Sequence, residues 1–350
     1  MSNPQIGRRE FIKGAAVGAA GVAVGLSMAD RVAAAKKPTK RKSKILNYNE
    51  NMEYRRLGKT NLMVSAVCLG GHWKRVNVMK QDFAENRHEV VSRCIDVGIN
   101  YLDACWGGEV KVYSKALAGR RDQMYLALSN GAKEPRNKGY RTAKKLLGSL
   151  DELLKGSNQE YTDLWRITCF ETGGKHSFDA SCGIAAALEK AKKQGKARFV
   201  GFSSHDRRWI KMMIEYFPQI EVVVFPYTAR TKTMPKDSLF DALKKCDVGA
   251  FGIKPFASGS LFKGSSAPDD PHRKEDDGRA RLAIRYILCN PYIIPIPGLI
   301  STQQVDNVAK AVMERRELDL AEANELEGAM NEAWAHLPEG YQWLKDWEYV

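Results

Sequence analysis

The sequence predicts a single (β/α)8 barrel, an α/β fold in which eight parallel strands alternate with eight helices. Eight short apolar segments alternate with helical patterns along the chain, and together they span about 260 residues, which is the usual size of one such barrel. The full length of 350 residues would also allow two ordinary domains. Eight successive strand–helix units nevertheless fit one closed barrel better than an open sheet.

Eight segments rich in β-branched or aromatic residues are predicted to be the strands. They are residues 64–69, 99–103, 124–128, 163–168, 199–202, 222–225, 249–253 and 293–296. In a barrel of this kind the chemistry sits at the C-terminal ends of the strands. We therefore look for functional residues at and directly after these segments.

The clearest helix is predicted at residues 141–154, where five leucines recur at spacings of three and four on one face. Further helices are predicted at residues 88–97, 183–194, 207–216, 238–245, 279–289 and 302–312. Ser301 followed by Gln304 is typical of the cap that starts the last of these. Beyond the barrel we expect a helix at residues 321–336 and an aromatic tail, which either lines a pocket above the barrel or packs across a pair of helices.

In the N-terminal segment, Arg8 and Arg9 precede a weakly apolar run and the small residues that end at Ala35. This pattern resembles a bacterial twin-arginine (Tat) signal peptide. The run has about 16 residues, whereas a membrane span needs about 20. We therefore expect a removable signal at 1–35, a basic linker at 36–51 and the barrel with its extension at 52–350. An uncleaved membrane anchor is the alternative; with cleavage, the protein is periplasmic or exported and meets the membrane only during export.

The net charge of +14 is concentrated near the N-terminus. The predicted linker alone holds six Lys and Arg residues against one acidic residue, Glu50. No basic element with interleaved aromatic residues is present in the sequence, so we expect no nucleic-acid partner. The seven cysteines include no Cys-x-x-Cys pair, which gives no support to an iron–sulfur cluster of the ferredoxin type.

Five ordered motifs lie between residues 53 and 312. They are Tyr-Arg-Arg-Leu-Gly-Lys-Thr at 54–60, Gly-Ile-Asn-Tyr-Leu-Asp at 98–103, Gly-Lys-Ala-Arg-Phe-Val-Gly-Phe-Ser at 195–203, Lys-Pro-Phe-Ala-Ser-Gly-Ser-Leu at 254–261, and Ile-Pro-Gly at 296–298 with Asn307. In this order they resemble the aldo-keto reductase family. The resemblance implies an oxidoreductase that transfers hydride between a nicotinamide dinucleotide and a small carbonyl or sugar-like substrate.

The export pattern adds one condition to that function. The Tat route exports folded proteins, and the periplasm has no obvious free nicotinamide pool. We therefore expect NADP or NAD to be loaded in the cytoplasm and held tightly, and a redox partner is a further expectation.

The sequence departs from the family at the residues that carry its chemistry. The family uses a Tyr acid, a Lys, an Asp and a His, of which only the Asp is kept, as Asp103. Ser129 stands at the Lys position, Thr168 stands at the His position, and the shortened loop at 104–109 contains no Tyr. Lys254 and His205 are the candidates for a substitute acid. Alternatively, Lys254 pairs with a carboxylate for structure, and His205 contacts a ligand or simply precedes the helix cap Asp206.

The resemblance also implies a set of cofactor-binding residues. They are Ser203, Ser204, Phe256, Ser258, Gly259, Gly298, Gln303, Gln304 and Asn307. The stacking aromatic of the family is replaced by Ile253, and no basic side chain for a 2′-phosphate is evident, so NADP rather than NAD is only the family's default. The alternative is that these glycines merely serve the turns of the barrel.

The sequence also raises a zinc site and an inactive barrel as possibilities. His72, Cys105, Cys169 and His205 all follow predicted strands, but their scattered spacing gives no zinc pattern, and we predict no metal site. The loss of the family's Tyr, Lys and His also leaves open a catalytically inactive barrel that binds a ligand or a protein partner.

Overall fold

The computed structural model describes residues 45–71, 76–169 and 176–350, which belong to one compact unit, Ser43–Val350. The predicted signal segment, most of the predicted linker and His72 lie outside the described residues. Among the described helices none is both long and apolar enough to cross a membrane.

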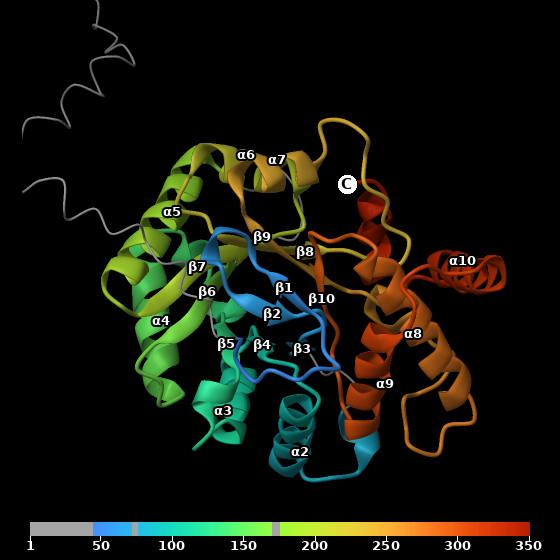
Figure 1. Ribbon diagram of the computed structural model, residues 1–350. Helices are drawn as coiled ribbons and strands as arrows, with labels where there is room; N and C mark the ends of the chain where they lie inside the picture. The colour runs from blue at the N-terminus through green and yellow to red at the C-terminus, as the bar shows by residue number, and fades with distance from the viewer. Residues whose placement is uncertain (1–44, 72–75, 170–175) are drawn as a thin grey trace, which may run out of the picture. The chain divides into compact units, whose positions relative to one another are not determined.

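Eight parallel strands form the barrel, so the predicted (β/α)8 fold is confirmed (Figure 1). The strands are β3 (Leu69–Gly70), β4 (Tyr101–Ala104), β5 (Tyr125–Leu128), β6 (Thr162–Thr168), β7 (Ala197–Ser203), β8 (Val222–Pro226), β9 (Gly249–Ile253) and β10 (Ile294–Ile296). Each strand pairs with its neighbours in chain order. The ring closes where the backbone N–H groups of Cys68 and Gly70 donate to the carbonyls of Pro295 and Pro297, at 3.1 and 2.8 Å.

Helices cover the outside of the strands (Figure 1). They are α2 (Phe83–Asp96), α3 (Gly107–Ala116), α4 (Ala143–Gly156), α5 (Phe178–Lys193), α6 (Arg207–Tyr216), α7 (Leu239–Cys246), α8 (Arg273–Leu288) and α9 (Thr302–Met313), followed by α10 (Leu320–Ala335). Short 3-10 helices lie at Gly58–Thr60, Val76–Met79, Arg121–Gln123, Gly131–Lys133, Lys138–Tyr140, Ala257–Gly259 and Glu339–Trp347. The predicted Ser301 cap is present, because its hydroxyl accepts from the Gln304 N–H at 3.2 Å.

Two details of the predicted elements were wrong. Residues 64–69 do not form one strand, because β2 (Met63–Ser65) pairs with β1 (Tyr54–Arg56) in an antiparallel hairpin and only Leu69–Gly70 joins the barrel. The segment 104–109 is not wholly a loop, because α3 begins at Gly107. The first two residues of α3 are glycines, which have low helix propensity, so the start of the helix is not evident from the sequence. Burial of Val110 and Tyr113 stabilises the helix.

The side chains of β6 show how the strands divide the core. Trp165 and Ile167 point outward and pack with the helices in the larger apolar cluster, whereas Leu164 joins the smaller cluster inside the barrel. Tyr101 and Phe251 stack inside the barrel with ring centroids 4.3 Å apart. This alternation follows from the two-residue period of a strand. It places the next inward residues of β6, Arg166 and Thr168, toward the C-terminal end of the barrel.

The close approach of β7 and β8 depends on Gly201. A Cβ atom there would lie 2.0 Å from the Val222 carbonyl oxygen, which belongs to the backbone of the neighbouring strand. We expect Gly201→Ala to lower the free energy of unfolding by at least about 1–3 kcal/mol, because the two strands must move apart. In the matched control Gly148→Ala, in α4, the new Cβ meets no atom within 4 Å, and we expect a gain of about 0.5–1 kcal/mol. Urea unfolding of both variants measures the difference, and equal effects would contradict the assigned contact.

Candidate active site

A cavity of about 570 Å³ opens at the C-terminal ends of the barrel strands. Every predicted catalytic and cofactor residue lines it: Asp103, Ser203, Ser204, His205, Lys254, Phe256, Ser258, Gly259, Gly298, Gln303, Gln304 and Asn307. The structure therefore brings together residues that lie as much as 204 positions apart in the chain, from Asp103 to Asn307. This is the end of the barrel where the fold places chemistry.

The floor of the cavity is a buried ion pair between Asp103 on β4 and Arg166 on β6. Arg166 Nε donates to Asp103 Oδ1 at 2.5 Å, and Arg166 Nη2 donates to Asp103 Oδ2. Only 5% of the Arg166 side chain and 6% of the Asp103 side chain are exposed. Burial disfavours the guanidinium charge, but the adjacent Asp103 carboxylate more than offsets it and holds the pKa of Arg166 above its usual value. Arg166 therefore keeps its positive charge at the floor of the cavity.

Arg166 is one of the site residues that were not predicted from the sequence. It supplies the positive charge beside Asp103, so Lys254 is not the cation of this pair. Its position two residues before Thr168 in a predicted strand shows that both share one face. The two-residue spacing alone, however, does not show that the inward-pointing Arg166 pairs with Asp103, because Asp103 lies on another strand. The first tyrosine after Asp103, Tyr113, donates its buried hydroxyl to the Gly70 carbonyl at 3.0 Å and is not among the cavity-lining residues.

A cluster of hydroxyl groups and one carboxyl group lies beside the ion pair. Arg166 Nη1 lies 3.2 Å from Thr168 Oγ1 and 3.3 Å from Ser203 Oγ. Thr168 Oγ1 lies 2.5 Å from Ser129 Oγ, which donates to Glu134 Oε2 at 2.7 Å. Glu134, a second residue that the sequence analysis missed, also accepts from the backbone N–H groups of Thr168 and Asn130 at 2.6 and 2.9 Å. Burial raises the pKa of the Glu134 carboxyl.

His205 lies at the rim, where its ring stacks on Trp343 with centroids 3.9 Å apart. Burial, together with the positive charges of Lys254 and Arg136, lowers the pKa of His205 to about 3. Its Nδ1 atom is shielded from solvent and has no hydrogen-bond partner among the described residues. The ring is therefore neutral near pH 7, which suits a ligand contact better than the role of an acid.

Lys254 follows β9 directly, and its Nζ lies 5.4 Å from the centroid of the Tyr341 ring. Tyr341 lines the cavity, whereas Trp347, six residues later, is buried and stacks on Phe225 at 5.7 Å. Part of the tail therefore lines the pocket, which is one of the two expected alternatives, and Trp347 packs on a residue of strand β8.

The loop after β9 has an unusual backbone. Lys254, Ala257 and Ser258 have φ angles of 64°, 49° and 61°, and Gly259 has a φ of 93°. Left-handed conformations cost about 1–2 kcal/mol for each residue other than glycine, and such strain tends to gather at ligand-binding loops. Lys254, Ser258 and Gly259 all line the cavity.

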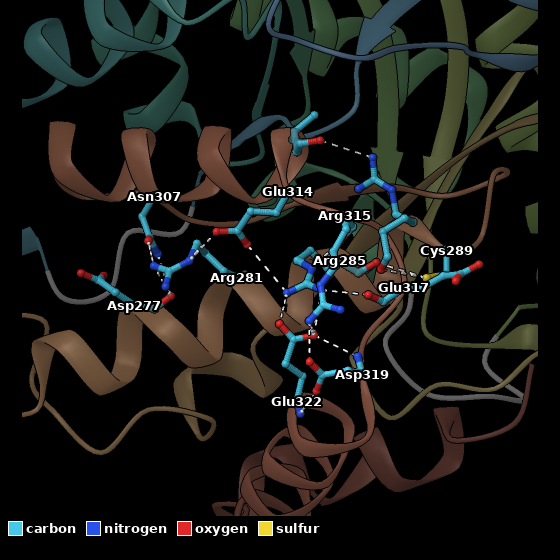
Figure 2. Close-up of polar contacts among 12 residues, drawn as sticks. Asp277, Arg281, Arg285, Cys289, Asn307, Glu314, Arg315, Glu317, Asp319 and Glu322 are labelled. Atoms are coloured by element: carbon cyan, nitrogen blue, oxygen red, sulfur yellow. Dashed lines mark hydrogen bonds and ion pairs between the residues drawn. The ribbon is translucent and has the colours of Figure 1, made fainter.

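The opposite wall is formed by α8 and the start of α9, and its amide side chains are already engaged. Gln303 Nε2 donates to Asp277 Oδ2 at 2.6 Å, and Asn307 Nδ2 donates to the Asp277 carbonyl at 3.0 Å. Arg281 donates to Asn307 Oδ1 at 2.6 Å and pairs with Glu314 at 3.2 Å. Figure 2 shows how this network continues through Arg285 to the end of α9 and the start of α10. These side chains therefore hold the wall in place and leave backbone groups to face a ligand.

The residues present fit a dinucleotide. Small residues, Ser258, Gly259 and Gly298, let the backbone approach a ligand closely, and the N-terminus of α9 at the cavity wall suits a phosphate group. Arg273, which the sequence analysis did not single out, also lines the cavity and offers a cation for a phosphate.

Among the described residues no group of three or more His, Cys, Asp or Glu side chains could hold a metal ion. Cys105 and Cys169 line the cavity as thiols whose pKa values burial raises.

Comparison with known proteins supports one family. A sequence model of the Aldo/keto reductase family matches residues 66–331. L-glyceraldehyde 3-phosphate reductase of Escherichia coli O157:H7 is 25% identical over 254 residues, which cover 66% of this chain and 69% of that protein. L-galactose dehydrogenase of Arabidopsis thaliana is 26% identical over 298 residues, which cover 77% of this chain and 91% of that protein.

Solved structures agree on the fold. An aldo-keto reductase from Bacillus halodurans in its holo form matches with a TM-score of 0.61 and 21% identity, over 83% of this chain and 99% of that one. An aldo/keto reductase from Klebsiella pneumoniae in complex with NADP and acetate matches with a TM-score of 0.57 and 19% identity, over 79% of this chain and 94% of that one.

The buried pair at the floor can be tested by a double-mutant cycle. We expect Asp103→Leu or Arg166→Met alone to lower the free energy of unfolding by about 3–5 kcal/mol, because each leaves an unpaired buried charge. The double variant should lower the free energy of unfolding by far less than the sum of the two single effects. The half-exposed pair Arg56–Asp247 is the control, with an expected coupling of about 0.2–1 kcal/mol. Urea unfolding measures all six variants, and additive effects at Asp103 and Arg166 would contradict the assigned pairing.

Proposed function

Because this chain belongs to the aldo/keto reductase family, we propose that it is an oxidoreductase that transfers hydride between a nicotinamide dinucleotide and the carbonyl group of a small, sugar-like substrate. The observation that carries the proposal is the cavity at the C-terminal ends of the strands, lined by a charged pair on its floor and by phosphate-compatible backbone on its walls. The curated relatives act, by their names, on L-glyceraldehyde 3-phosphate and L-galactose, which makes these two compounds suitable first probes.

The nicotinamide, when bound, supplies or accepts the hydride. The strained loop after β9 and the start of α9 would hold the dinucleotide. Arg166, fixed by Asp103, would place a permanent positive charge near the oxygen on which negative charge develops. His205 would contact the substrate as a neutral ring, and Lys254 would add a second positive charge at the rim.

Binding of the dinucleotide tests this proposal directly. Denaturing the purified protein should release a compound with nicotinamide absorbance, and titration of the emptied protein with NADPH and NADH should show saturable binding. We expect Lys254→Met to weaken that binding about tenfold, which corresponds to about 1.4 kcal/mol. Lys244→Met is the matched control, because Lys244 also lies over an aromatic ring, that of Tyr292 at 4.9 Å, but is not among the cavity-lining residues.

If neither dinucleotide binds, the alternative of an inactive ligand-binding barrel is favoured and the oxidoreductase proposal fails. Turnover of L-glyceraldehyde 3-phosphate or L-galactose with a bound dinucleotide would exclude that alternative. The ratio of the two binding constants also decides between NADP and NAD.

We also propose that residues 1–35 are a Tat export signal, that residues 36–51 are a linker, and that the protein acts in the periplasm. The pair Arg8–Arg9 before the weakly apolar run supports this. The double substitution Arg8→Lys with Arg9→Lys should keep the protein in the cytoplasm, whereas Arg31→Lys, outside the pair, should not. Cell fractionation measures the distribution, and normal export of the double variant would refute the signal assignment.

A further inference from the structure

Glu134 is a buried carboxyl group that has no role in the chemistry proposed above. It is 1% exposed, and it is not among the residues that line the cavity. Two hydroxyl groups join it to the cavity: Ser129, which is fully buried, and Thr168, which lines the floor beside Arg166. The links between these three side chains are 2.7 and 2.5 Å long, short enough for a proton to pass along each hydrogen bond.

The donors in this chain of hydrogen bonds can be counted. Ser129 has one hydroxyl proton, and it points to Glu134, so the bond between Ser129 and Thr168 must use the Thr168 proton. Arg166 Nη1 donates to the Thr168 oxygen from the other side. With Glu134 ionised, both hydroxyl protons therefore point away from the cavity, and the Thr168 oxygen can accept a proton from a ligand there.

We propose that Thr168, Ser129 and Glu134 form a proton relay that exchanges, with the substrate oxygen, the proton that accompanies hydride transfer. The inference rests on the proposed oxidoreductase function and adds the source and destination of the proton. It assigns the proton transfer in part to Ser129 and Thr168, which stand where the family has its Lys and His.

The step balances in both directions. During oxidation of an alcohol, the substrate O–H bond breaks as hydride leaves its carbon for the nicotinamide. The proton goes to Thr168 Oγ1, the Thr168 proton moves to Ser129 Oγ, and the Ser129 proton moves to Glu134, which becomes a neutral carboxylic acid. During reduction the same three transfers run backward, and Glu134 returns to a carboxylate.

The surroundings of Glu134 allow it to hold a proton. Burial raises its pKa, while hydrogen bonds from Asn130, Ser129 and Thr168 and the charge of Arg166 on β6 act in the opposite direction without cancelling the rise. Among the described residues Cys169, directly after β6, also interacts with Glu134, and burial together with the Glu134 charge raises the pKa of the Cys169 thiol. The Glu134 carboxyl is thus expected to titrate above its ordinary value of 4.5.

Glutamine keeps the size of Glu134, and its amide oxygen can accept from the Ser129 hydroxyl and the Thr168 N–H, so that only the bond from the Asn130 N–H is lost. Unlike the carboxylate, it cannot take up the relayed proton. Glu134→Gln is therefore the test variant. Glu221→Gln is its matched control: Glu221 is a buried carboxylate that accepts from the Val200 N–H at 3.0 Å, but it precedes β8 at the opposite end of the barrel.

The first measurement needs no cofactor or substrate. In the infrared difference spectrum of the full chain, a carboxylic-acid C=O band should appear as the pH is lowered, with a midpoint above 4.5. The band should be absent from Glu134→Gln, present in Glu221→Gln, and shifted in Ser129→Ala, which removes its hydrogen-bond donor. If Glu134→Gln has the wild-type spectrum over the whole pH range, or if Ser129→Ala leaves the band unmoved, the relay is refuted.

The second measurement uses the dinucleotide-loaded enzyme with L-glyceraldehyde 3-phosphate or L-galactose. We expect Glu134→Gln and Thr168→Val to lower kcat about 10²–10⁴-fold, the usual contribution of proton transfer, with little change in KM. Thr168→Ser should keep most of the activity, and Glu134→Gln should flatten the pH profile of kcat. Wild-type kcat and pH profile in Glu134→Gln would refute the relay while leaving the oxidoreductase proposal intact. Failure of the wild type to bind any dinucleotide would refute the proposed function, and the infrared titration would then decide whether the hydrogen-bonded chain carries a proton.

Discussion

The pairing of Asp103 with Arg166 is the constraint around which the cavity is built. Moving two full charges into a barrel interior costs several kcal/mol per ion, and only close pairing with further hydrogen bonds offsets that cost. The bidentate contact provides the pairing, and the hydroxyls of Thr168 and Ser203 lie within reach of Arg166 Nη1. The polar residues at the ends of β4, β6 and β7 are therefore tied to one another, and the floor cannot be changed at one position without affecting the others.

The use of a guanidinium at this place has a chemical consequence. A lysine ammonium can give up a proton when its surroundings disfavour charge, but an arginine keeps its charge in proteins. Arg166 can therefore stabilise negative charge but cannot act as a proton donor at neutral pH. The small side chains of Ser129 and Thr168 fit beside it and form hydrogen bonds that lead away from the cavity. Ser129, Thr168 and Arg166 are thus coupled through their hydrogen bonds, and a change at one of them affects the other two.

The fold could be predicted because its signals are local. The leucine spacing in α4, the Ser301 cap of α9 and the apolar runs of β5 and β9 each depend on a few neighbouring residues. The division of residues 64–69 between a hairpin and the barrel could not be predicted, because it depends on which distant strand pairs with each half.

The candidate site was predicted where a motif followed a strand, as at Lys254, His205 and Gly298. Arg166 and Glu134 were missed because their importance depends on long-range partners. Asp103 is 63 positions from Arg166, and Thr168 is 34 positions from Glu134. A charged residue inside an apolar strand indicates a functional site only when its partner is known. The sequence does not show which distant residue lies beside it in the fold.

The two thiols that line the cavity bear on how this protein behaves toward oxidants. The reactive form of cysteine is the thiolate, and the raised pKa values of Cys105 and Cys169 keep both as thiols near pH 7. Cys289, by contrast, is exposed on the outer surface. Peroxide or an alkylating label would therefore modify the surface well before it reached the cavity. An odd number of cysteines then poses little risk to the site, and a probe attached at Cys289 leaves the cavity chemically untouched.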